Sequence, residues 1–445
     1  MKRKAALALV LAMVMTGCGG GGKNTDSQAP AVESQTEENS QQADAAQPDE
    51  AEAEETSGDV LTIEFFQQKT NEGPQKGYQE IIDHFNEENP DIRIEMNTVP
   101  DAGTVLTSRI SSGDIPVIFS DYPTQVQFRQ KVANGYVQDL SDQEFLKNVN
   151  EAALEMTKQE DGKYYALPYS HNYMGVYYNI DIFEENGVEV PATWEEFIQV
   201  CEKLQAAGIT PMGLHGKDPG RVGHMFQCAV ITWAPNGVEI IEDAVKGETK
   251  LEGNEEFINV FEKMKVLFDY SNEDALALSD TACYENFVNG QYAMCITGSY
   301  SRGTLMASNP DIRLGVFGLP SDTKESTKTL AGIDAAICVS ASATDEEKAA
   351  AYRFLEYLAK TENAQIFCNY DGAPSCVNGV VSDDAGVAPM LDLIAAGQTH
   401  DWMASTISNN VVTDLYNVVQ GFWADKDVDA VLKNMDASIA VTSME

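Results

Sequence analysis

Residues 60–66, VLTIEFF, alternate apolar side chains at Leu61, Ile63 and Phe65, which is the period-two pattern of a half-buried strand. Apolar residues then recur at helical spacing over residues 78–85, and the pair Asn89-Pro90 ends that helix. A second alternating run, residues 92–96, and an apolar third strand, residues 116–119, follow. Strands that alternate with helices predict an α/β fold with a largely parallel sheet covered on both faces.

The same kind of pattern continues past residue 160. Residues 174–178 read as a strand, and Gly208 is placed to end the helix that follows Thr193. Residues 193–196 (TWEE) and 344–347 (TDEE) each have the spacing of a capping box before an apolar helical stripe. The chain shows no tandem repeat.

The N-terminus has the features of a targeting segment. Three basic residues precede an apolar run, residues 5–15, that is too short for a stable membrane span. The following Met15-Thr16-Gly17-Cys18 resembles a bacterial lipobox, although Met15 stands where Leu is commoner. We therefore expect residues 1–17 to be a lipoprotein signal peptide and Cys18 to carry the lipid; a plain secretory signal is the alternative.

Residues 18–59 differ in composition from the rest of the chain. Residues 26–59 contain eleven acidic residues and no Lys or Arg, with little apolar surface to bury. Such a segment is predicted to be a disordered tether between a lipidated Cys18 and the folded part.

Size and charge limit the possible functions of the folded part. About 385 residues after the tether exceed what one hydrophobic core usually holds, so two lobes are expected. The formal net charge of −41 excludes nucleic-acid binding as a function class, because nothing would neutralise phosphates.

The chain has eight cysteines, of which seven follow Cys18. The odd count leaves at least one thiol unpaired, and most lie among apolar residues. Free, buried thiols are the favoured interpretation, with a Cys368–Cys376 pair as the alternative.

Several blocks together resemble one family, the extracellular solute-binding proteins of ABC importers, in the branch that takes maltose and other oligosaccharides. The blocks are residues 86–92 (NEENPDI), 112–118 (SGDIPVI), 161–169 (DGKYYALPY), 177–179 (YYN), 191–196 (PATWEE), 298–300 (GSY), 331–337 (AGIDAAI) and 352–358 (YRFLEYL). Each block is weak alone, but their order and spacing extend the resemblance over most of residues 60–436. Tyr300 and Ala331 depart from it, because family members often have Trp and Gly there.

The resemblance implies a two-lobed periplasmic-binding-protein fold with discontinuous lobes, a hinge and an interlobe cleft. One lobe would comprise residues 60–170 with 334–385, and the other residues 171–333 with 386–445. The chain would cross between lobes near residues 170–173 and 332–334, and ligand would bind in the cleft.

Candidate ligand-binding residues are polar and aromatic side chains at strand ends and at the crossings, because sugars present both hydroxyls and an apolar face. They are Phe66, Gln68, Asp121, Tyr122, His171, Asp218, Arg221, Trp233, Tyr300, Asp334 and Trp402. Ordinary structural roles compete: Asp121 could cap a turn, and Trp233 and Trp402 could belong to the core. Trp194 is interpreted as packing.

No catalytic, metal or cofactor motif is present, so we expect no enzyme activity and no cofactor. The predicted function is capture of a sugar by a monomer anchored at the outer face of the bacterial cytoplasmic membrane, with delivery to ABC transporter permease subunits. The alternatives are the same fold binding polyamine or peptide, a sensory partner of a histidine kinase and, less favoured, a glycoside hydrolase.

Overall fold

The computed structural model describes residues 60–334, 336–381 and 385–443. The predicted signal peptide, Cys18 and the tether lie outside the described residues. Within them, no helix is both long enough and apolar enough to cross a membrane.

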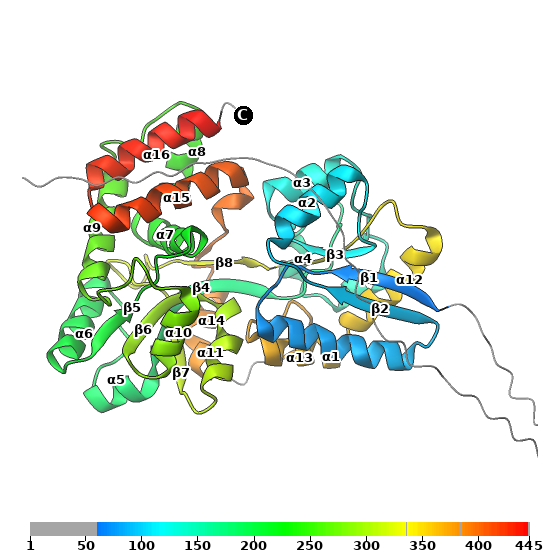
Figure 1. Ribbon diagram of the computed structural model, residues 1–445, viewed down its shortest axis with the longest axis horizontal. Coiled ribbons are helices and arrows are strands. Elements are labelled where there is room, and N and C mark those ends of the chain that lie inside the picture. Colours follow the sequence, from blue (N-terminus) through cyan, green and yellow to red (C-terminus); the bar gives the residue numbers. More distant parts are fainter. Residues whose placement is uncertain (1–59, 335, 382–384, 444–445) are drawn as a thin grey trace, which may run out of the picture. The chain divides into compact units, whose positions relative to one another are not determined.

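One sheet has four strands in the order β2-β1-β3-β9 (Figure 1). β1 (Leu61–Phe66) is parallel to β2 (Ile92–Asn97) and to β3 (Ile118–Asp121), as predicted, and β9 (Ala336–Val339) is antiparallel to β3. The associated helical segments are α1 (Glu72–Glu88), α2 (Ala102–Ser112), α3 (Val126–Ala133), η1 (Glu144–Asn148), α4 (Glu151–Met156), α12 (Asp345–Leu358) and α13 (Thr361–Asp371).

The second sheet contains six strands, with β7 (Leu314–Phe317) pairing with β4 beside the path β10-β8-β4-β6-β5. The other strands are β4 (His171–Asn179), β5 (Thr210–Gly213), β6 (Tyr292–Gly298), β8 (Thr329–Ile333) and β10 (Thr399–His400). The expectation of a largely parallel sheet is wrong here, because the central β4 runs antiparallel to β6, β7 and β8.

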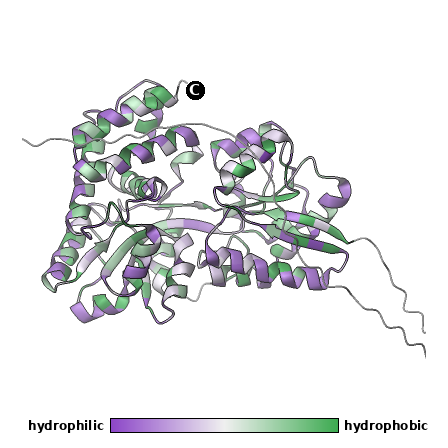
Figure 2. Cartoon of the chain, in the orientation of Figure 1, coloured by the Kyte–Doolittle hydropathy of each residue, from purple (hydrophilic) through white to green (hydrophobic). Residues whose placement is uncertain are grey.

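The helical segments that follow β4 complete this part of the chain. They are α5 (Ile180–Asn186), α6 (Trp194–Ala206), α7 (Pro219–Trp233), α8 (Gly237–Val245), α9 (Glu255–Asp269), α10 (Asp280–Val288), η2 (Ser299–Ser301), α11 (Arg302–Ser308), η3 (Ala385–Val387), α14 (Ala388–Ala395), η4 (Met403–Ser405), α15 (Asn409–Asp425) and α16 (Val428–Thr442). Hydrophobic and hydrophilic residues alternate along the helices in Figure 2, which is typical of helices with one buried face.

Each sheet has its own large hydrophobic core, which confirms the predicted two-lobed fold. Phe65, Phe119 and Phe354 belong to the core of the four-stranded sheet. Phe226 and Phe261 belong to the core of the six-stranded sheet.

The two segments predicted as crossings are paired with each other. β4 and β8 run antiparallel, with His171 opposite Ile333 and Asn172 opposite Gly332. β8 belongs to the six-stranded sheet and β9 to the four-stranded sheet, so the chain passes between the sheets next to Asp334. The precise lobe boundaries and the hinge role of these segments remain predictions.

Local expectations have mixed outcomes. The capping box at Thr344 is confirmed. At Thr193 only half of the box forms, because the carboxylate of Glu196 accepts from the backbone N–H of Ala192 instead. All seven cysteines after Cys18 are free and buried, so Cys368 and Cys376 are not paired; the Cys368 thiol faces the carbonyl of Ala373 at 3.2 Å.

Candidate functional site

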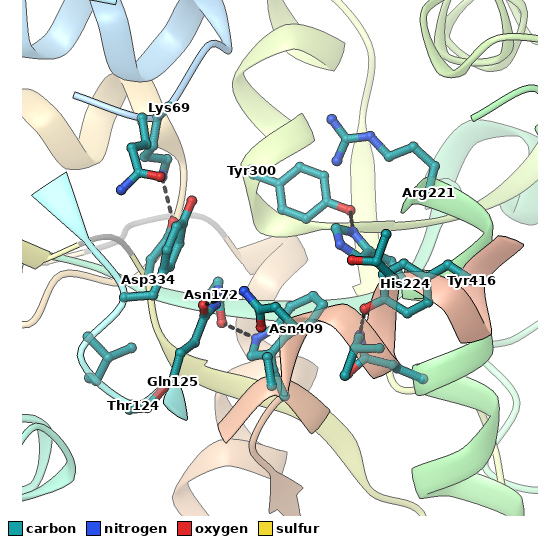
Figure 3. A pocket seen from close by; sticks show the side chains of 18 of the residues that line it. Lys69, Thr124, Gln125, Asn172, Arg221, His224, Tyr300, Asp334, Asn409 and Tyr416 are labelled. Carbon is teal, nitrogen blue, oxygen red and sulfur yellow. Dashed lines mark hydrogen bonds and ion pairs between the residues drawn. The ribbon is translucent and has the colours of Figure 1, made fainter. Parts of the chain in front are cut away.

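A cavity of about 380 Å³ is lined by residues from both halves of the chain. Its wall combines aromatic rings, amides and hydroxyls with few charges. Figure 3 shows Lys69 and Asp334 on one side and Arg221, Tyr300, His224 and Tyr416 on the other. This size and mixture suit a small polar organic ligand.

The ends of elements place these side chains. Gln68 and Lys69 follow β1, Tyr122 follows β3, and Asp334 lies between β8 and β9. These are the positions at which α/β folds commonly bind ligands. Asn172 reaches the cavity from β4.

Two helices each turn one face toward the cavity. Arg221, His224 and Gln227 lie three residues apart on α7, whose first turn is capped by the side chain of Asp218. Asn409 and Tyr416 are seven residues apart on α15 and so share a face.

A cluster of rings surrounds His224. Its Nδ1 lies 3.1 Å from the Tyr300 hydroxyl, and its ring contacts that of Trp402 with 5.0 Å between centroids. Burial, the charge of Arg221 and the neighbouring His215 lower the pKa of His224 to about 3. The imidazole is therefore neutral at pH 5–8, and it can offer one donor and one acceptor.

Arg221 is held on the same side of the cavity. Its guanidinium carbon lies 4.7 Å from the centroid of the Tyr300 ring, and its Nε lies 3.1 Å from Oδ2 of Asp280 on α10. Arg221 therefore covers one face of Tyr300 and has its own charge paired.

Trp402 is oriented by a hydrogen bond from its indole Nε1 to Oδ1 of Asn172, at 2.8 Å. The preceding Asp401 approaches the backbone of Gly332 so closely that a Cβ there would lie 2.6 Å from a carboxylate oxygen. The glycine thus allows the segment that carries Trp402 to lie directly against β8.

Near Asp334, the ammonium of Lys69 lies 2.5 Å from Oδ2 of Asp334 and 2.8 Å from Oδ1 of Asp371. Burial disfavours the charge on Lys69, but the two carboxylates outweigh burial and raise its pKa. Lys69 is therefore a cation at physiological pH.

Hydrogen bonds also connect α3 with the segment that leads into α15. The guanidinium of Arg129 donates to the carbonyl of Ser405 at 2.8 and 2.7 Å. The side-chain amide of Asn409 donates to the side chains of Gln127 at 2.6 Å and Gln125 at 3.3 Å.

The structure brings six of the eleven predicted residues to this cavity. They are Gln68, Tyr122, Arg221, Tyr300, Asp334 and Trp402. Their contact with a ligand stays a prediction.

The other five predicted residues do not line the cavity. Phe66 is buried beneath Arg109, and Asp121 forms an ion pair with Lys131. Asp218 caps α7, and His171 pairs with β8. Trp233 packs in the core and donates from Nε1 to the carbonyl of Pro320 at 3.0 Å. Its ring contacts that of Trp194, which confirms the interpretation of Trp194 as packing.

Residues that the candidate set omitted also line the cavity. They include Lys69, Asn172, His224, Gln227, Asn409 and Tyr416. Helical spacing from Arg221 could have indicated His224 and Gln227. Nothing in the sequence links Lys69 to Asp371, which is 302 residues away.

Metal ligation has no support from the described part of the chain. It contains no group of three or more His, Cys, Asp or Glu side chains that could hold a metal ion.

Comparison with known proteins agrees with this architecture. The chain is 26% identical over 403 residues to the multiple sugar-binding protein of Streptococcus mutans, covering 86% of this chain and 91% of that protein. It superposes on a structure described as the solute-binding protein RafE in complex with raffinose with a TM-score of 0.78, 26% identity, and coverage of 86% of this chain and 100% of the other. For the apo form of RafE from Streptococcus pneumoniae the TM-score is 0.72 with 27% identity, covering 87% and 99% of the two chains.

A family model described as bacterial extracellular solute-binding protein matches residues 80–390, which is more than half of the chain. With the two-lobed fold and the cavity between segments of both sheets, this match establishes that the chain belongs to the bacterial extracellular solute-binding protein family.

Proposed function

We propose that this protein captures an uncharged oligosaccharide and delivers it to the permease subunits of an ABC transporter. The observation that carries the proposal is the chemistry of the cavity wall. Among its lining residues, Asp334 is the one acid and it is paired with Lys69, while Arg221 is paired with Asp280. Although the chain has a net charge of −41, the charged side chains of the cavity wall are therefore paired.

The remaining wall suits a sugar. Rings of Tyr122, Trp402 and Tyr416 can pack against the apolar face of a pyranose. The amides of Gln68 and Asn172 lie on the same cavity and can both donate to and accept from hydroxyl groups. Sites that combine such rings with convergent polar groups bind carbohydrates through contacts that need no net charge.

The names of relatives support the same ligand class. The relative from Streptococcus mutans is a multiple sugar-binding protein, and a Bacillus subtilis relative, 19% identical over 343 residues, is named for melibiose, raffinose and stachyose. These names describe binding proteins, which supports a role in which the ligand is returned unchanged.

Two other carboxylates that a polyamine site could have used have partners away from the cavity. Asp121 is paired with Lys131, and Asp218 caps α7. Because a polyamine site needs several unpaired carboxylates around the ligand, this arrangement favours a neutral ligand.

A thermal-shift screen tests the ligand class. The purified protein is heated with raffinose, stachyose, xylo-oligosaccharides and chitin oligosaccharides, and with spermidine and a tripeptide on the same plate. A ligand at a hundred times its dissociation constant adds about 2.7 kcal/mol of stability, a rise in Tm of about 3 °C for this size.

A rise with a neutral sugar that is recovered intact is the expected result. A rise with spermidine or peptide alone contradicts the ligand class, and release of shortened sugar contradicts the binding role. No rise with any ligand would instead favour the sensory role.

The proposed location is the outer face of the bacterial cytoplasmic membrane, with the protein anchored as a monomer through Cys18. The basic start, the apolar run and the lipobox-like residues 15–18 support it. Cys18→Ala is expected to leave the protein in the medium or unprocessed, as judged by cell fractionation and mass spectrometry. Normal membrane retention of this variant contradicts the anchor.

A further inference from the structure

A largely buried group of two ion pairs lies at the edge of the cavity. Lys69, next to the end of β1, is 5% exposed and contacts Asp334 at 2.5 Å and Asp371 at 2.8 Å. The three residues come from segments that are far apart in the sequence: Asp334 lies between β8 and β9, and Asp371 ends α13. A contact among them can form only when the chain has folded around this point.

The two carboxylates have different surroundings. Asp334 lines the cavity, whereas Asp371 is 0% exposed and does not line it. Oδ2 of Asp371 has no hydrogen-bond partner among the described residues. Asp371 is therefore in place to hold Lys69, while Asp334 is in place to accept hydrogen bonds from a ligand.

We propose that Lys69 is a positioning residue of the ligand site: held by Asp371, its ammonium keeps the carboxylate of Asp334 directed into the cavity as a hydrogen-bond acceptor. The inference rests on the proposed function, in which Asp334 accepts hydrogen bonds from sugar hydroxyls. It assigns to Lys69 and Asp371 a role in ligand affinity without requiring that either contact the ligand.

The geometry explains why a cation is needed at this point. Both carboxylates approach a single nitrogen within 2.8 Å, so without the ammonium they would face each other in a buried site. Two carboxylates so placed share a proton and titrate as a pair. A shared proton removes part of the acceptor capacity of Asp334.

The other titratable groups around Asp334 cannot replace the lysine. Burial raises the pKa of Tyr78, Tyr122 and Cys376, and burial lowers the pKa of His171, so all four are neutral at physiological pH. Among the described residues, Lys69 is the one Lys or Arg that forms an ion pair with Asp334.

The test is the pH dependence of raffinose affinity, measured by titration calorimetry from pH 5.5 to 8.5. The wild-type protein is expected to show a nearly flat profile. In Lys69→Met the affinity is expected to fall as the pH is lowered, by up to about tenfold per pH unit, because binding then requires removal of a proton from the carboxylate pair. Loss of packing alone would lower affinity equally at every pH.

Lys131→Met is the matched control. Lys131 also forms a 2.5 Å ion pair with a buried carboxylate, that of Asp121, with side chains 15% and 6% exposed. Neither residue lines the cavity, so this variant can lose stability but is expected to keep the flat profile. Asp371→Asn, which leaves Lys69 paired with Asp334, is also expected to keep it.

If Lys69→Met does not fold, Lys69→Gln takes its place, since its side-chain amide can donate to both carboxylates without adding a charge. A sloped profile in either lysine variant supports the proposal. A flat profile in a folded lysine variant that still binds raffinose overturns it. Wild-type protein that binds no sugar refutes the proposed function instead, so the two failures are distinguishable.

Discussion

Replacement of Trp402 by alanine tests the proposed stacking surface. Trp402 is half-buried on the cavity wall, and its indole contacts His224 and is fixed by the 2.8 Å hydrogen bond to Asn172. The substitution removes the ring that a sugar would cover and leaves the Asn172 oxygen without its donor. It leaves the ion pairs of Lys69 and Arg221 in place.

The expected magnitude follows from these contacts. An aromatic anchor in a ligand contact typically contributes about 2 kcal/mol or more. Loss of the hydrogen bond to Asn172 adds about 1 kcal/mol through poorer preorganisation. A total of about 3 kcal/mol corresponds to a dissociation constant about 150-fold higher.

Titration calorimetry with raffinose measures this change directly. Trp402→Phe keeps a ring but loses the donor, and its affinity is expected to fall by about fivefold. Trp194→Ala is the control, because Trp194 stacks on Phe197 outside the cavity. If Trp402→Ala binds raffinose as tightly as the wild-type protein, or if Trp194→Ala weakens binding equally, the assignment of Trp402 to the ligand site is refuted.

Two further predictions concern stability. Burial lowers the pKa of His215 to about 4 and of His224 to about 3, below the value of 6.5 for a free histidine, so the unfolded chain binds more protons between these values. The free energy of unfolding should therefore decrease as the pH falls below 6.5, by about 2 kcal/mol per histidine at pH 5. In urea unfolding, His215→Gln should reduce this loss. If the free energy of unfolding of His215→Gln falls below pH 6.5 as steeply as that of the wild-type protein, this reasoning is refuted. Gly303→Ala should destabilise by about 1–3 kcal/mol because its Cβ would lie 2.4 Å from the carbonyl oxygen of Tyr370. Gly421 lies on α15 with open space around it, so Gly421→Ala should stabilise the protein by about 0.5–1 kcal/mol. Equal effects of the two glycine variants on Tm would contradict this reasoning.

The fold could be predicted from short-range patterns. Alternation at Leu61, Ile63 and Phe65 and the helical spacing that follows correctly predict β1, α1 and β2, because each pattern reports which side chains must be buried. The direction of β4 relative to its neighbours could not be predicted in this way. It depends on pairing with β8, about 160 residues later, to which no local pattern points.

The candidate site could be predicted only in part. Strand ends correctly indicate that Gln68, Tyr122 and Asp334 reach the cavity. The same reasoning is misleading for Asp121 because a local lysine pairs with it. The role proposed for Asp371 could not be predicted, because it depends on a contact between the end of α13 and a side chain beside β1.

The most direct test is a crystal structure of the purified protein with raffinose at saturating concentration. The sugar is expected in the cavity, with one ring against Trp402 and hydroxyl groups within hydrogen-bond distance of Asp334. A sugar bound away from this cavity, or an empty cavity in protein that calorimetry shows to be saturated, would contradict this expectation.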